Sequence, residues 1–172
     1  MSKEENPMRG IRLSQVTVNM GVGEPGDELK RAVSVLELVT DSKPVQTKCK
    51  VKQPTWGIRE GLPIGTKVTL RGAKAEKFIK AALSAKDNTL KKKNFDRCGN
   101  FGFGIKEHID LPGVKYDPKL GIRGMDVLVS LSRPGYRIKK RKLAKKKIMG
   151  KHAITKDEAF AFVSQKYGVE IK

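Results

Sequence analysis

Two stretches of the chain, residues 44–52 and 65–71, alternate strictly between apolar or small side chains and polar, mostly cationic ones. In a strand, a period of two sends these two sets to opposite faces. We therefore predict two strands that pack one face on a core and present a face without carboxylates to a partner. The inward set is Val45, Thr47, Cys49, Val51, Thr66, Val68 and Leu70, and the outward set is Gln46, Lys48, Lys50, Lys52, Lys67, Thr69 and Arg71.

The rest of the pattern predicts three more strands and two helices. Residues 11–20, 101–109 and 125–131 alternate as strands do. Apolar residues recur at helical spacing in two places between them. These helix-forming sets are Leu29, Ala32, Val33 and Leu36, and Ala75, Phe78, Ile79, Ala82 and Leu83. The resulting order is strand, helix, strand, strand, helix, strand, with one more strand.

This order is typical of an α+β fold of the ferredoxin-like, RRM-like type. In such a split β-α-β sheet, helices cover one face and leave the other open. A long loop would join the second and third strands, and a basic C-terminal extension would end in a helix. The residues predicted on the open face are Thr17, Asn19, Gln46, Lys48, Lys50, Lys67, Thr69 and Arg71.

Composition extends the cationic character to the whole chain. The 172 residues contain 37 Lys and Arg against 18 Asp and Glu, a formal charge of +19. Such an excess indicates a polyanion as the partner. We expect one domain over residues 1–172, with a core at about 9–133 and a basic segment and terminal helix at 134–172. Two unpaired cysteines and the lack of a long apolar run predict a reduced cytosolic protein, with no membrane partner.

Three segments outside the predicted core carry candidate contacts. The 52–63 loop holds Lys52, Gln53, Arg59 and the only tryptophan, Trp56, which could either stack on RNA or fold back on the domain. The 86–100 segment supplies Arg97 and Asn100. Residues 137–151 hold nine basic side chains in fifteen, and the candidates there are Arg137, Lys139, Lys140 and Arg141.

A terminal helix should follow the basic run. Thr155 with Glu158 three residues later predicts a capping box, and Gly168 can end the helix. Such a helix would anchor the basic segment at its far end.

Other motifs are weaker. Gly21, Gly23 and Gly26 form a GxGxxG, but neighbouring acids would repel a pyrophosphate, so we expect no cofactor. Phe101 and Phe103 resemble the aromatic strand of an RNA-recognition motif, although core positions suit them better. No metal-ligand cluster or catalytic set is present in the sequence, which predicts a protein that is not an enzyme.

The quoted residues resemble a known family. Residues 17–24 (TVNMGVGE), 57–72 (GIREGLPIGTKVTLRG) and 121–126 (GIRGMD) are similar to the large-subunit ribosomal protein five family, which binds 5S ribosomal RNA. The turn at 133–136, the basic segment and the terminal helix resemble its archaeal and eukaryotic branch, numbered eleven in eukaryotes. The resemblance covers nearly the whole chain.

The resemblance implies a cytoplasmic, non-enzymatic component of the large subunit. Family members join 5S rRNA to large-subunit rRNA in the central protuberance, among neighbouring ribosomal proteins. Their long loop approaches P-site tRNA, and they form a bridge to a protein of the small-subunit head. Asn19 and Thr69 match family positions that contact 5S rRNA, and Arg59 matches a loop arginine near tRNA. The alternatives from the residues are a nucleotide-dependent enzyme using the glycine loop and a free-standing RNA-binding regulator.

Overall fold

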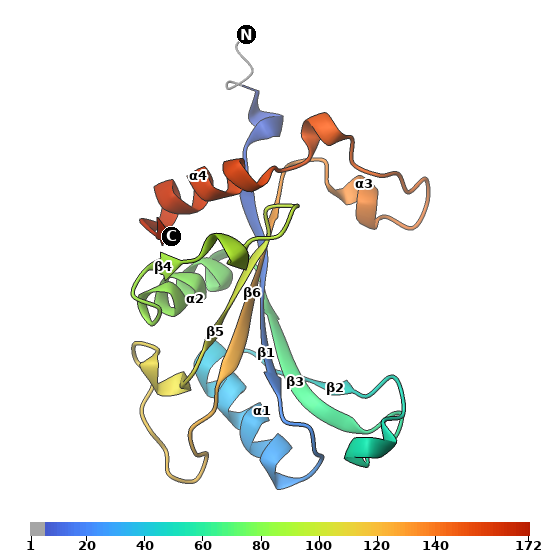
Figure 1. The fold of residues 1–172 in the computed structure, drawn as a ribbon, viewed down its shortest axis with the longest axis vertical. Coiled ribbons are helices and arrows are strands. Elements are labelled where there is room, and N and C mark those ends of the chain that lie inside the picture. Colours follow the sequence, from blue (N-terminus) through green and yellow to red (C-terminus); the bar gives the residue numbers. More distant parts are fainter. Residues whose placement is uncertain (1–5) are drawn as a thin grey trace.

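The alternating segments form one five-stranded antiparallel sheet in a computed structural model that describes residues 6–172. Residues 1–5 of the predicted domain lie outside the described residues. The sheet has the strand order β2-β3-β1-β6-β5 (Figure 1). Its strands are β1 (Arg12–Gly21), β2 (Val45–Lys48), β3 (Pro63–Leu70), β5 (Phe101–Ile105) and β6 (Met125–Ser132).

The predicted split β-α-β topology is confirmed. The helix α1 (Asp27–Thr40) links β1 to β2, and β3 lies between these two strands. After α2 (Gly72–Ser84), the chain forms β5 at the sheet edge before β6 returns beside β1. The additional strand is therefore β5, inserted between the second helix and the strand that completes the fold.

Both helices pack on the face of the sheet that carries the apolar alternation. Val16, Val18 and Val127 on that face are fully buried. In α2 the predicted apolar set is buried as expected. In α1 one position differs, since Val35 is buried and Val33 only half-buried. The first turn of α1 carries Asp27 and Glu28, which suit the positive end of a helix dipole.

The second strand departs from the prediction in length and in phase. It ends at Lys48, and Val45 and Val51 are 61% and 64% exposed instead of buried. Val45 lies opposite Lys67, and Gln46 lies opposite the buried Thr66. Because directly opposed residues share a face, placing Gln46 on the open face was wrong. A strict alternation indicated a strand here, but β2 is an edge strand whose apolar side chains find no core to cover them.

The C-terminal part extends the core at the other end of the sheet. After a short α3 (Arg137–Lys140), the helix α4 (Lys156–Tyr167) begins at the predicted capping box of Thr155 and Glu158 and ends at Gly168, where φ is 66°. Beyond it, β7 (Glu170–Ile171) pairs in parallel with β4 (Thr89–Leu90). Ala159 and Val163 of α4 are fully buried in the same apolar cluster as the sheet. Within residues 6–172, no helix combines the length and apolarity that crossing a membrane requires.

Candidate nucleic-acid interface

The face of the sheet opposite the helices is open and lined by small polar side chains. Strand register places Thr17 opposite Thr69 and Asn19 opposite Lys67. On the other side of β1, Thr17 and Asn19 lie opposite Leu128 and Asp126. Further residues of this face are Gln15, Ser130, Gly102 and Gly104. We call this set, with Arg71, the sheet floor.

The sheet floor holds fewer charges than the outward alternation predicts. Lys67 and Arg71 are exposed on it, and so is the carboxylate of Asp126. The Arg71 Nη2 donates to the Gln15 side-chain oxygen at 3.1 Å, which fixes the guanidinium over the end of β1. Short hydroxyl and amide groups and Gly104 leave room for a nucleic-acid backbone to approach the sheet closely, while the Leu128 side chain covers Gly102.

The hairpin of β2 and β3 flanks the floor on one side. Its tip is closed by two backbone hydrogen bonds between Gln53 and Ile58, at 2.9 and 3.1 Å. Gly57 has a φ of 65°, which makes the turn at the tip possible without strain. Trp56 is 73% exposed, so it does not fold back on the domain. Lys48, Lys50, Lys52 and Arg59 are exposed along the same hairpin.

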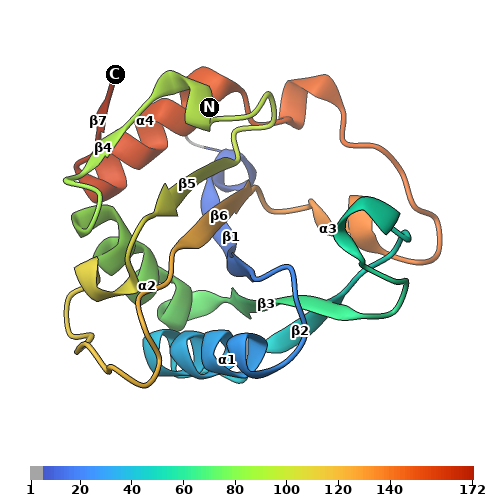
Figure 2. The same cartoon turned by 60° about the horizontal axis from the view of Figure 1, so that its bottom comes forward.

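The basic segment flanks the floor at the end opposite the hairpin. Figures 1 and 2 show α3 and the hairpin tip on the side of the sheet away from α2. Arg137, Lys139, Lys140 and Arg141 are all exposed there, as predicted. A hollow of about 1030 Å³ separates this segment from the ends of β1 and β6. Five lysines line it, with no carboxylate: Lys139, Lys140, Lys145, Lys146 and Lys147.

The two residues of the 86–100 segment that were predicted to contact RNA differ in whether their side chains are free to bind it. Arg97 is exposed and free to meet a ligand. The Asn100 amide is used inside the protein: its nitrogen donates to Asp96 at 2.9 Å, and its oxygen accepts from the Leu131 amide at 3.1 Å. This geometry favours a structural role for Asn100, which holds the turn before β5.

The structure supports neither base stacking by the 101–103 strand nor a metal site at a histidine. Phe101 and Phe103 are buried at 3% and 6% exposure, so they belong to the core. The imidazole of His108 accepts from the Arg123 amide at 3.3 Å, and that of His152 bonds to the Pro134 carbonyl at 2.9 Å. Within the part of the chain that the structure describes, no group of three or more His, Cys, Asp or Glu could hold a metal ion.

Sequence reasoning missed several residues of the interface. Gln15, Leu128 and Ser130 share the sheet floor, and Leu128 is 50% exposed there. The alternation of β6 contained this signal, because its apolar set leaves Asp126, Leu128 and Ser130 on the opposite face. The lysines at 145–147 had no such signal, since only the folded path of the segment brings them to the hollow.

An open sheet floor between two cationic flanks, on a split β-α-β fold, defines a basic nucleic-acid-binding class of protein. The chain matches two family models, one described as ribosomal protein L5, over residues 6–59, and one for the C-terminus of the same ribosomal family, over residues 63–162.

Curated archaeal relatives agree over nearly the full length. A large ribosomal subunit protein uL5 of Methanococcus maripaludis is 49% identical over 171 residues, covering 98% of this chain and 94% of that one. A protein of the same name from Methanoregula boonei is 46% identical, covering 96% and 100%. The chain therefore belongs to the ribosomal protein L5 family. It is a structural component of the ribosome, located there in the cytoplasm, and not an enzyme.

Proposed function

We propose that the protein binds 5S rRNA with the sheet floor and attaches it to large-subunit rRNA in the central protuberance. The observation that carries this proposal is the arrangement of charge: small polar groups occupy the floor, and exposed cations occupy both flanks. RNA backbone contacts need cations for phosphates and short donors or acceptors for sugars and bases at close approach. A solvated surface without a ligand would not need this separation.

The predicted residues other than Asn100 then have these roles in the proposed interface. Lys48, Lys50, Lys67 and Arg71 neutralise phosphates of 5S rRNA. Asn19 and Thr69, neighbours across β1 and β3, bond groups of the RNA that come close to the sheet. Gln46 faces the other side of β2, so it contacts RNA only where RNA wraps round the sheet edge.

Two further contacts extend the proposal beyond 5S rRNA. The 52–63 tip, with Lys52, Gln53, Trp56 and Arg59, reaches P-site tRNA, since it stands clear of the floor. The basic segment, through Arg137, Lys139, Lys140 and Arg141, and the nearby Arg97 bind large-subunit rRNA. The protein would also bridge to the small-subunit head.

A charge-neutralised variant tests the 5S site. Lys48→Gln, Lys50→Gln and Lys67→Gln together should weaken 5S rRNA binding by about 2–3 kcal/mol at low salt, at roughly 1 kcal/mol per lost contact. The dependence of affinity on salt should also become shallower, because fewer counterions are released. Filter binding at several salt concentrations measures both quantities.

The matched control neutralises three exposed lysines in or beside the helix layer, Lys43, Lys77 and Lys80. This variant has the same net charge but leaves the floor and its flanks intact. It should keep most of the affinity. Equal losses in the two triple variants would mean that net charge, and not the sheet floor, binds the RNA.

A further inference from the structure

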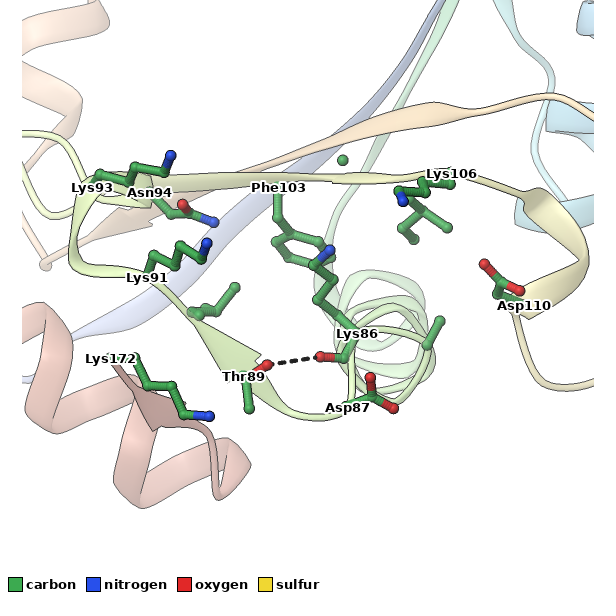
Figure 3. Close-up of a pocket in the computed structure, with 14 residues that line it drawn as sticks. Lys86, Asp87, Thr89, Lys91, Lys93, Asn94, Phe103, Lys106, Asp110 and Lys172 are labelled. Atoms are coloured by element: carbon green, nitrogen blue, oxygen red, sulfur yellow. Dashed lines mark hydrogen bonds between the residues drawn. The ribbon is translucent and has the colours of Figure 1, made fainter.

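A separate groove lies beside β5, on the edge of the sheet farthest from the hairpin. It has a volume of about 620 Å³ and is bounded by β5 on one side and by the 85–94 segment on the other. Figure 3 shows Phe103 projecting from β5 into this gap towards Lys86. Leu90 and Ile105 also line it, but these two side chains and that of Phe103 are only 1%, 4% and 6% exposed, so they form its closed base.

The groove exists because the two chain segments that bound it diverge. They meet at one end, where Phe95 and Phe101 form an isolated antiparallel bridge. From there the 89–93 segment turns away from β5, because β4 pairs with β7 instead. Among the described residues, β5 has β6 as its one neighbour in the sheet, so its outer edge lacks a partner strand from Gly102 onwards.

The rim of the groove is cationic. Five lysines line it, Lys86, Lys91, Lys93, Lys106 and Lys172, against two carboxylates, Asp87 and Asp110. None of these lysines forms an ion pair within residues 6–172. In Figure 3, Lys91 and Lys93 lie near one end of β5, and Lys106 and Asp110 lie near the other.

We propose that this groove binds an extended, acidic segment of a neighbouring protein, which adds a strand to the free edge of β5. An unpaired strand edge offers main-chain donors and acceptors in a row, and an extended peptide satisfies them. The lysines on the rim of the groove take the carboxylates of that peptide.

An RNA strand fits these features less well. Phosphates would use the lysines but would leave the main-chain donors and acceptors of the unpaired strand edge without a matching strand. Of the sheet-floor residues, the groove shares Gly104, and the five lysines of its rim lie outside the floor, so the proposal does not depend on how 5S rRNA binds. Its failure would leave the RNA-binding proposal untouched.

The test uses the full chain and fluorescein-labelled peptides of eight residues. One peptide alternates glutamate with threonine, and its control alternates glutamine with threonine. Fluorescence anisotropy should detect binding of the acidic peptide to the protein and no binding of the glutamine control. Hydrogen exchange of the amides at 101–106 should slow when it binds, as strand addition requires.

Charge reversals locate the site. Lys91→Glu with Lys106→Glu should weaken peptide binding at least tenfold and leave 5S rRNA affinity unchanged. The matched control, Lys139→Glu with Lys145→Glu in the basic segment, should keep peptide binding.

Three results would overturn the proposal. They are no binding of the acidic peptide, equal loss in both reversal variants, and unchanged exchange at 101–106. A labelled eight-nucleotide oligouridine that binds the native chain and is lost with Lys91→Glu and Lys106→Glu, while the peptide does not bind, would make the groove an RNA site.

Discussion

The Arg133 guanidinium donates to the Glu158 carboxylate at 2.8 Å, from a side chain that is only 3% exposed. The same arginine donates to the backbone carbonyls of His152 and Ala153, at 3.2 and 3.1 Å. Glu158 also accepts from the Thr155 amide as half of the capping box. One ion pair therefore joins the end of β6 to the start of α4, and the whole basic segment lies between these two fixed points.

Removing the carboxylate should destabilise the fold. Glu158→Gln leaves the Arg133 charge buried with only neutral acceptors, which should cost about 1–3 kcal/mol of unfolding free energy, the usual range for a hydrogen bond to a charged group. Urea unfolding followed by circular dichroism measures this loss. Asp157→Asn, an exposed acid in the same first turn, is the control and should change stability far less. Equal losses would show that the helix dipole, and not the Arg133 pair, accounts for the effect.

The same pair should make stability depend on pH. Partial burial acts to raise the pKa of Glu158, but hydrogen bonds from Thr155 and Arg133 outweigh it and hold the pKa below the usual 4.5. A carboxyl whose folded pKa is lowered stabilises the fold fully above its unfolded pKa, and that contribution is lost as pH falls through the folded pKa. The stability difference between native and Glu158→Gln proteins should therefore shrink below about pH 4.5. Urea midpoints across this range measure it, and a constant difference would contradict the assignment.

Tyr167 should ionise only at high pH. Burial, with the Glu76 carboxylate nearby, raises the pKa of Tyr167 to about 12. Its hydroxyl is buried without a hydrogen-bond partner among the described residues. Tyr167→Phe should therefore leave the unfolding free energy unchanged or raise it by up to about 1 kcal/mol. Ultraviolet titration should lose its late step in this variant, and a late step that persists would contradict the assignment to Tyr167.

Trp56 should matter for tRNA and not for stability. Its side chain stands free at the hairpin tip, so Trp56→Ala should change unfolding free energy by less than about 0.5 kcal/mol. If the indole stacks on RNA, ribosomes with this variant should hold P-site tRNA about 1–3 kcal/mol less tightly. Toeprinting or filter retention measures that occupancy. Tyr116→Ala removes another exposed aromatic, 55% accessible, and should leave tRNA binding unchanged.

Strands covered by helices could be predicted from sequence. In β1 and β3 the alternation of Val16 and Val68 with polar neighbours has a direct cause, because one face packs on helices and the other does not. The capping box at Thr155 could also be predicted, since all of its chemistry lies within four residues.

What could not be predicted depends on contacts between distant segments. The phase of β2 follows from its register with β3, and Gln46 alone carries no sign of Thr66 opposite it. The pair of β4 and β7 joins two-residue strands about eighty positions apart, too short to produce a pattern. Likewise, Arg133 is buried only because α4 returns to meet it.

The strand β3 belongs both to the covered sheet and to the projecting hairpin. Thr66, Val68 and Leu70 are buried beneath the helices, while Pro63 and Ile64 stand nearer the tip. The ladder with β2 is irregular between these two parts, because a bulge between Thr47 and Lys48 shifts its register before it reaches Pro63. A load applied at Trp56 would therefore meet this irregular step of the ladder before the regular pairing of β3 with β1, and the hairpin would bend at the step more readily than the sheet.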